Sequence, residues 1–308
     1  MRHYRSHILP IFECLPAHMQ GLIHPIKTPV ARPHVSHIAL VASWQDVRAL
    51  MGRNRMIYVE HGAGQSYSAD PRTARMPGYS ASGGIRHTGV IGYISPNERV
   101  AGNWRNAPSI AVGCPKMDAF HGMTPIGPPS VCFAFHWDAV LSPESRTAFD
   151  HYEKALPEII DSFRAQGFGV YGHAHPKWEG KLDARLNAVG INAMLPDDRT
   201  VFQTASMLFV DNSSLGPEFM SLGRPIVWLN SPRYRREMNH GGRFWEWTKG
   251  ALTVDKPDEL LHFDIAEHLA TDPYKAAREQ IVNDIYAFTD GSSGERAAAF
   301  IVQRLTAM

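Results

Sequence analysis

The most informative stretch of the sequence is MLFVDNSSLGPEFMSLGRPIV, residues 207–227. It begins with an apolar run of strand length, turns polar at Asp211–Ser214, and continues with residues that suit the first turn of a helix. Gly223-Arg224-Pro225 then predicts a tight turn into a second apolar run. A strand, a helix and another strand in this order are typical of a parallel β-α-β unit.

The same pattern extends outward in both directions. Further apolar runs closed by turn or polar residues are HIALVAS (37–43), RMIYVEHG (55–62), GVIGYIS (89–95), SIAVGCP (109–115), VCFAFHW (131–137), FGVYGHAH (168–175), PIVWLN (225–230) and ALTVD (251–255). A helix is predicted from SRTAFDHYEKALPEIIDSFRAQG (145–167), and residues 1–36 are interpreted as an irregular entry segment. The alternation predicts parallel sheets covered by helices, with ligands beyond the carboxyl ends of the strands.

The length of the chain indicates two domains, because 308 residues exceed the usual range of one hydrophobic core. The segment CPKMDAFHGMTPIGPPS (114–130) is rich in proline and suits a linker. We therefore place a domain boundary near residue 127. The prediction is one Rossmann-like domain over 1–127 and a second over 128–308, with a helix around 294–306 returning to the first domain.

Composition excludes several classes of protein. A formal net charge of +1 gives no general attraction to nucleic acids or anionic lipids. Three cysteines, Cys14, Cys114 and Cys132, are an odd number at unrelated spacings, which argues against a disulfide framework. No run approaches the ~20 apolar residues of a membrane helix, so we expect a cytoplasmic protein without a transmembrane segment.

The polar residues after Val210 suit the binding of a diphosphate. Ser213 and Ser214 offer hydroxyl groups at the predicted start of a helix, and Glu218 could accept hydrogen bonds from the two hydroxyls of a ribose. The alternative is structural: either serine would be a simple N-cap, and Glu218 a first-turn acid favoured by the helix dipole.

A second candidate site is Gly172-His173-Ala174-His175-Pro176-Lys177, at the end of another predicted strand. His175 and Lys177 could both bind phosphate oxygens. Two histidines at this spacing could instead hold a metal ion or be structural. Because the spacing indicates no third ligand, we predict no metal site.

A third candidate is His61, which follows a predicted strand and precedes Gly62, Gly64 and Gln65. A histidine at the carboxyl end of a strand is well placed to act as a general base, and glycines let the backbone approach a ligand. A histidine that caps the strand for structural reasons would give the same pattern.

Five motifs together resemble the CDP-glycerol glycerophosphotransferases of teichoic-acid synthesis. They are Glu60-His61-Gly62, Val112-Gly113-Cys114-Pro115-Lys116-Met117-Asp118, His175-Pro176-Lys177, Asp211-Asn212-Ser213-Ser214 and Thr289-Asp290-Gly291-Ser292-Ser293-Gly294-Glu295-Arg296. The sequence departs from the family pattern where Ala63 replaces threonine and Asn212 replaces tyrosine. The resemblance implies the GT-B fold, in which two Rossmann-like domains face a central cleft.

The resemblance also implies residue roles. His61 would activate an acceptor hydroxyl, and His175 would contact the donor diphosphate. The implied donor-binding residues are Gly172, His173, His175, Lys177, Asp211, Asn212, Ser213, Ser214, Gly216, Glu218 and Arg224. Gly62, Gly64 and Gln65 would lie on the acceptor side. The implied partner is a nucleotide-activated donor, with no separate cofactor and, in the absence of an Asp-x-Asp motif, no metal ion.

Other functions remain open at this stage. His61-Gly62-Ala63-Gly64-Gln65-Ser66-Tyr67 also resembles a stretch of the non-hydrolysing UDP-N-acetylglucosamine 2-epimerases. The segment from Arg233 to Trp247 mixes cations and aromatics, which suits either a loop beside the donor or a nucleic-acid acceptor. A third possibility is a nucleotide-sugar-binding protein without catalysis.

Overall fold

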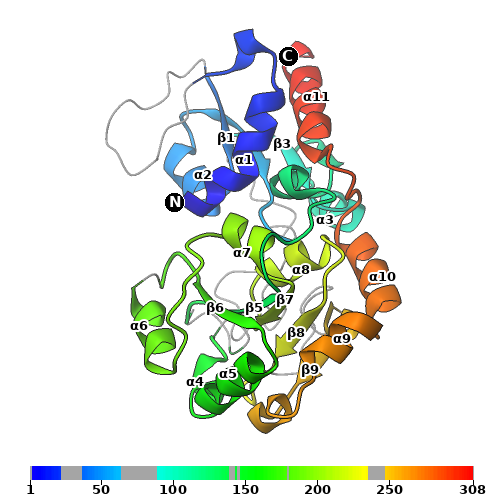
Figure 1. Ribbon diagram of the computed structural model, residues 1–308. Coiled ribbons are helices and arrows are strands. Elements are labelled where there is room, and N and C mark those ends of the chain that lie inside the picture. The colour runs from blue at the N-terminus through cyan, green and yellow to red at the C-terminus, as the bar shows by residue number, and fades with distance from the viewer. Residues whose placement is uncertain are drawn as a thin grey trace. The chain divides into compact units, whose positions relative to one another are not determined.

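The computed structural model describes residues 2–21, 37–63, 89–138, 143, 146–178, 180–234 and 247–307. The described residues form two compact units (Figure 1). Unit 1 holds those within Met1–Ser66, Pro77–His121 and Asn283–Met308, and unit 2 those within Gly122–Val282. No helix in these ranges is both long and apolar enough to span a bilayer.

Unit 1 is built on a parallel sheet of four strands. The strands are β1 (Ile38–Val41), β2 (Arg55–Val59), β3 (Val90–Ser95) and β4 (Ser109–Ala111), in the order β1-β2-β3-β4. Its helical elements are α1 (Arg2–Cys14), η1 (Ala17–Met19), α2 (Trp44–Leu50), α3 (Glu98–Asn103), η2 (Pro115–Phe120) and α11 (Ser293–Thr306). Each of the four apolar runs predicted before residue 115 contains one of these strands.

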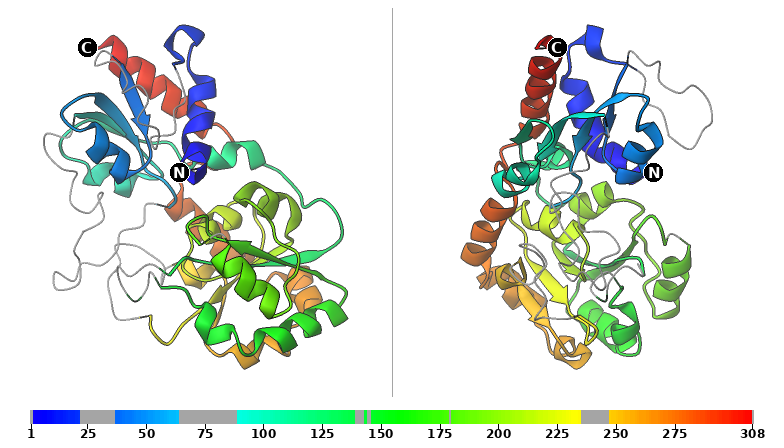
Figure 2. Two further views of the ribbon diagram at one scale, coloured as in Figure 1. Left: turned by 90° about the vertical axis from the view of Figure 1, so that its left-hand side faces the viewer. Right: turned by 180° about the vertical axis from the view of Figure 1, so that it is seen from behind.

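The two faces of this sheet are covered by different elements. Ile57 and Val59 of β2 belong to a cluster that also contains Ile11 of α1 and Phe300 of α11. Met56 and Tyr58, which alternate with them, belong to the opposite cluster. Figures 1 and 2 show α1 and α11 side by side, in agreement with their contacts.

The helix α1 corrects the expectation of an irregular entry segment. Its partly buried Tyr4 and Ile8, its buried Ile11, and Leu15 just beyond it recur at helical spacing and pack on the sheet. Pro10 lies inside this helix, although proline lacks a backbone N–H and is unfavourable in a helix interior. Packing of the apolar face therefore outweighs the local signal.

The Asp118 carboxylate holds the start of α11 against the rest of unit 1. Asp118 accepts hydrogen bonds from the backbone N–H groups of Ser293 (3.1 Å) and Gly294 (2.6 Å). Gly113 adopts φ +89°, and a Cβ at this position would lie 2.3 Å from the carbonyl oxygen of Phe288. Two of the motifs that carried the family resemblance thus meet here, and their contacts hold the C-terminal helix in place.

Unit 2 contains a parallel sheet of five strands. They are β5 (Ser130–Phe135), β6 (Gly169–Ala174), β7 (Met207–Val210), β8 (Ile226–Leu229) and β9 (Leu252–Val254), in the order β6-β5-β7-β8-β9. The helical elements are α4 (Phe149–Tyr152), α5 (Leu156–Ala165), α6 (Lys181–Ala188), α7 (Asp198–Thr204), α8 (Leu215–Met220), η4 (Trp247–Gly250), η5 (Pro257–Leu260), α9 (Ile265–Thr271) and α10 (Lys275–Ile285). The last three residues of α10 belong to unit 1.

The strand order of unit 2 contains a reversal. From β5 the chain crosses to β6 on one side, and it then returns to β7 on the other side of β5. In open parallel sheets such a topological switch point opens a crevice at the carboxyl ends of the two strands. Stacked rings below it, with centroids of Phe133 and Phe209 4.9 Å apart, form part of the core.

Candidate functional site

The switch point of unit 2 lies between the segments that follow β5 and β7. His136 and Trp137 follow β5, and Asn212, Ser213 and Ser214 follow β7. The polar residues singled out from the sequence therefore come at the position where a parallel sheet of this order binds ligands. The segment His136–Trp137 was missed because nothing in the sequence predicts that β5 lies between β6 and β7.

Asp211 joins these two segments. Its carboxylate is buried and accepts hydrogen bonds from the N–H groups of His136 (2.8 Å) and Ala148 (3.0 Å) and from the Thr147 hydroxyl (3.4 Å). Burial raises its pKa to about 7, although these hydrogen bonds oppose the shift. Both oxygens accept hydrogen bonds from the protein, so Asp211 holds the segments after β5 and β7 together.

His173 and Gly172 both have structural contacts within unit 2. The ring nitrogens of His173 lie 2.9 Å from the carbonyl oxygen of Leu195 and 3.1 Å from Asp198. A Cβ on Gly172 would lie 2.7 Å from the sulfur of Met194. Both residues therefore secure β6 against the segment that follows α6.

His175, Lys177 and Trp137 form a cluster at the carboxyl ends of β5 and β6. The Lys177 ammonium lies 4.2 Å from the centre of the Trp137 ring, and burial lowers the pKa of this lysine. The rings of Trp137 and His175 are 6.2 Å apart. Because Nδ1 of His175 accepts from the N–H of Lys177 (3.1 Å), a neutral ring carries its proton on Nε2. The cluster therefore offers an N–H donor and a cation to an anion.

The residues that follow β7 differ in their exposure and in their hydrogen bonds. Ser213 and Ser214 are partly exposed, and Ser213 Oγ accepts from the N–H of Leu215 (3.3 Å). Asn212 is buried and its side-chain amide has no partner among the described residues. A Cβ on Gly216 would lie 2.5 Å from the Trp228 ring, so this glycine is required by packing.

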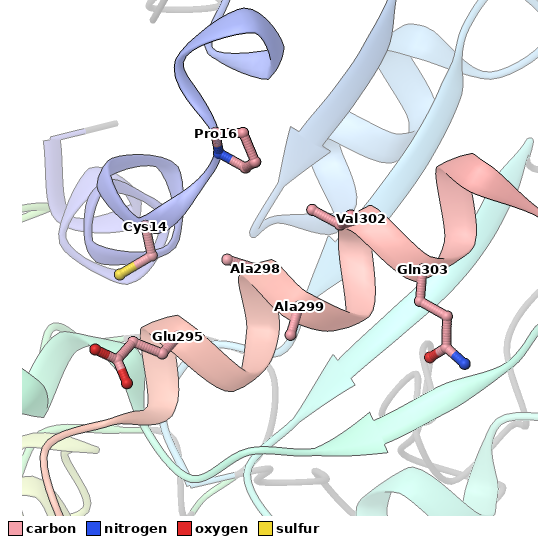
Figure 3. A pocket seen from close by; sticks show the side chains of 7 residues that line it. All are labelled: Cys14, Pro16, Glu295, Ala298, Ala299, Val302 and Gln303. Carbon is pink, nitrogen blue, oxygen red and sulfur yellow. The ribbon is translucent and has the colours of Figure 1, made fainter.

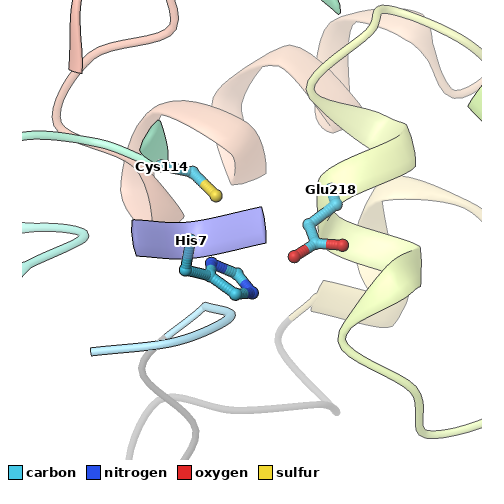
Figure 4. A group of neighbouring side chains, drawn as sticks. All are labelled: His7, Cys114 and Glu218. Atoms are coloured by element: carbon cyan, nitrogen blue, oxygen red, sulfur yellow. The ribbon is translucent and has the colours of Figure 1, made fainter. Parts of the chain in front are cut away.

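Glu218 and Arg224, which were both predicted to bind the donor, lie in different parts of unit 2. Glu218 is buried, and it projects from α8 (Figure 4). Arg224 precedes β8 at the amino end of the sheet, and its guanidinium donates to the carbonyl oxygens of Phe202 (2.6 Å), Ala205 (2.9 Å) and Met123 (2.9 Å). The structure therefore places Arg224 at the amino end of the sheet, away from the segment that follows β7, and burial lowers its pKa to about 10.

In unit 1, His61 directly follows the carboxyl end of β2 and Glu60. Its ring lies 4.9 Å from that of Tyr4, edge to face, and 6.2 Å from that of His7. Gly62 has φ +70°, a conformation that favours glycine. Gly64 and Gln65 lie outside the described residues, as do residues 235–246 of the Arg233–Trp247 segment.

Glu60 was not assigned a role from the sequence. Its Oε2 is buried without a partner among the described residues, and burial raises its pKa to about 8. A carboxyl group with this pKa can exchange a proton near neutral pH. In the same unit, His7 of α1 and Cys114 lie close to each other, with a ring nitrogen of His7 within 4.8 Å of the Cys114 sulfur (Figure 4).

A groove of about 450 Å³ lies elsewhere in unit 1, between the end of α1 and α11 (Figure 3). Its lining includes Cys14, Glu295, Ala298 and Val302. None of the predicted site residues borders it, and its walls are mostly apolar. We therefore place the candidate site at the strand ends instead.

Comparisons with known proteins support the fold. TagF, a wall teichoic acid polymerase, matches with a TM-score of 0.55 at 16% identity, over 83% of this chain and 69% of that chain. The S. aureus MnaA-UDP co-structure matches at 0.54 and 14%, over 88% and 76%. A putative UDP-N-acetylglucosamine 2-epimerase from Listeria monocytogenes matches at 0.52 and 14%, over 88% and 75%. No family model and no curated protein matches the sequence.

At these identities the likeness establishes the fold alone. The chain has an α/β fold of the GT-B type, with two parallel sheets of the Rossmann kind. This confirms the predicted fold class.

Proposed function

We propose that this protein transfers a glycerol-phosphate or glycosyl group from a nucleotide-diphosphate-activated donor to an acceptor hydroxyl. The single observation that carries the proposal is the position of Asn212-Ser213-Ser214 beside the β5/β7 switch point. Ligands of doubly wound sheets bind at such a point, and the hydroxyl groups of Ser213 and Ser214, which could bind a phosphate, follow β7 here.

The leaving group would be stabilised by unit 2. As the acceptor oxygen forms its bond to the transferred group, the bond to the nucleotide breaks and negative charge grows on the departing phosphate. Nε2–H of neutral His175, the Lys177 ammonium and the hydroxyls of Ser213 and Ser214 would bind that charge. These groups would supply electrostatic stabilisation without a divalent metal ion.

The acceptor proton would be removed by His61. The ring follows β2 in a setting of Tyr4 and His7, and the backbone turns sharply at Gly62. Lys116 to Asp118, which the family resemblance also highlighted, would serve mainly to hold α11 through Asp118. The acceptor hydroxyl itself could belong to a glycan, a polymer or a modified nucleic acid.

Two of the similar structures support a nucleotide donor. The MnaA structure is a co-structure with UDP, and one TagF structure contains CDPG. We therefore propose a nucleotide donor for this chain and test cytidine and uridine compounds first.

The test measures binding and turnover together. CDP-glycerol and UDP-N-acetylglucosamine, with CDP and UDP, are titrated by calorimetry, and turnover is followed in chelator with candidate acceptors. Ser213→Ala/Ser214→Ala should weaken donor binding at least tenfold, since hydrogen bonds to a charged group contribute about 1.5–3 kcal/mol each. Ser221→Ala is the matched control, because Ser221 lies at the other end of α8 and donates to the Glu218 carbonyl oxygen. Unchanged affinity in the double variant, or an absolute need for added Mg²⁺ or Mn²⁺, would refute the proposal.

A second candidate is a UDP-N-acetylglucosamine 2-epimerase-like activity. The observation that favours it is the match to a putative UDP-N-acetylglucosamine 2-epimerase from Listeria monocytogenes over 88% of this chain, together with the His61–Tyr67 stretch. Incubation of the protein with UDP-N-acetylglucosamine alone distinguishes the two. An epimerase forms a second UDP-sugar without any acceptor, whereas a transferase requires one.

A further inference from the structure

Two buried asparagines extend neighbouring strands of unit 2 beyond the switch point. Asn212 follows β7 and Asn230 follows β8. The parallel register pairs Val210 with Trp228, so each asparagine comes two residues after a registered pair. Asn212 is 1% exposed and Asn230 is 7% exposed. Equivalent positions on adjacent parallel strands place both amides at the same carboxyl edge.

These amides leave hydrogen-bonding groups unused. Among the described residues, Nδ2 and Oδ1 of Asn212 and Oδ1 of Asn230 have no partner. Asn230 Nδ2 donates to Asp255 Oδ1 at 2.6 Å, and a carboxylate accepts only, so the orientation of this amide is fixed. Buried polar groups in folded proteins are almost always paired, so three unused atoms at one sheet edge indicate a ligand.

The chemistry of the unused atoms selects the ligand. Two amide oxygens require two hydrogen-bond donors, and one NH₂ group requires an acceptor. An ionised diphosphate has no donor and uracil has one N–H, so neither satisfies both oxygens, and cytosine does so only if both hydrogens of its one amino nitrogen go to different asparagines. Neighbouring hydroxyl groups both donate and accept, and so satisfy all three atoms.

We infer that Asn212 and Asn230 bind neighbouring hydroxyl groups of the nucleotide-activated donor. The inference rests on the proposed function and deepens it, because it separates a hydroxyl-binding pair from the phosphate-binding His175, Lys177, Ser213 and Ser214. The hydroxyls come either from the transferred polyol or sugar or from the ribose. Asn212 stands where the similar family has tyrosine, so this feature belongs to the present chain.

The first test needs no ligand. Asn212→Leu removes an unpaired buried amide and keeps an apolar side chain of similar size, so the Tm of the ligand-free protein should stay level or rise. Asn212→Ala adds no atoms and therefore controls for steric clash. The matched control for the substitution to leucine is Asn187→Leu, at an exposed position of α6. A Tm lowered by several degrees in both Asn212 variants would mean that the amide is paired without ligand, and would overturn the inference.

The second test compares ligands by calorimetry. Asn212→Leu should weaken CDP-glycerol or UDP-N-acetylglucosamine binding about tenfold, as expected for two lost neutral hydrogen bonds. If the hydroxyls are those of the transferred group, UDP and CDP bind the variant as they bind the wild type. If they are those of the ribose, UDP binding falls equally and 2′-deoxy-UDP binding does not.

The outcomes separate the two proposals. Wild-type protein that binds none of these nucleotides would refute the proposed function and with it the inference. Wild-type protein that binds them, with affinities unchanged in Asn212→Leu, would refute the inference alone.

Discussion

The two units handle a buried acid at a strand end in opposite ways. In unit 2, Asp211 is surrounded by three hydrogen-bond donors from the protein. In unit 1, the buried Oε2 of Glu60 has no partner among the described residues. Burial raises the pKa of both groups, to about 7 and about 8. The comparison teaches that a shifted pKa does not by itself distinguish a carboxylate that holds the fold from one available for proton transfer.

The largest expected effect separates the chemistry of unit 1 from the binding of unit 2. His61→Ala should lower turnover by roughly 10²- to 10⁴-fold, the range typical of a lost general base, with donor affinity unchanged. His18→Ala, an exposed histidine of η1, is the matched control. Steady-state kinetics with a verified donor and acceptor, beside calorimetry of the donor, checks this. Near-wild-type turnover in His61→Ala would show that His61 is not the general base.

The next effect distinguishes the amino edge of the unit 2 sheet from its carboxyl edge. Arg224→Met should lower the free energy of unfolding by about 2–4 kcal/mol, because three carbonyl oxygens lose a charged donor. The affinity for the nucleotide-activated donor should not change, because these hydrogen bonds lie at the amino ends of the strands. Chemical denaturation and calorimetry measure the two quantities. If Arg224→Met is as stable as the wild type but binds the nucleotide-activated donor more weakly, Arg224 is part of the binding site.

A smaller effect is expected for the paired acid. Asp211→Asn puts an NH₂ group against N–H and O–H donors, which should cost about 1–3 kcal/mol of unfolding free energy. Because Asp211 fixes the segments on both sides of the switch point, donor affinity should fall in parallel. Denaturation midpoints and donor titrations of the same sample measure both. A variant that is fully stable would show that the three hydrogen bonds contribute little.

The last effect concerns the unpaired acid and depends on pH. The folded-state pKa of Glu60, about 8, lies above its ordinary value of 4.5. The folded state therefore keeps its proton more tightly, and the stability contributed by Glu60 is present below pH 4.5 and lost as the pH rises through 8. Glu60→Gln removes this titration, so the variant should match the wild type near pH 4.5 and exceed it near pH 8.5. Thermal unfolding across this range checks it, and parallel curves for the two proteins would contradict it.

Much of the architecture follows from local sequence patterns. Apolar runs of strand length with turn residues after them predict the strands, since a buried parallel strand needs an uninterrupted apolar segment. The helix α1 was not predicted, because the pattern of Tyr4, Ile8 and Ile11 is short and contains Pro10. Its stability comes from packing on β2 and α11, which involves residues distant in the sequence.

The sequence by itself determined the fold class and the positions after strands where polar side chains gather, because these depend on periodicity and on residue types next to one another. Only the tertiary structure decided which of those side chains are used by the protein itself. Arg224, His173 and Asp211 are occupied by backbone and side-chain partners that lie far away in the sequence. Asn212 and Asn230 are 18 residues apart in the chain and share an edge only because β7 and β8 are neighbours. The strand order sets these partnerships, and that order arises from long-range packing that no local pattern encodes.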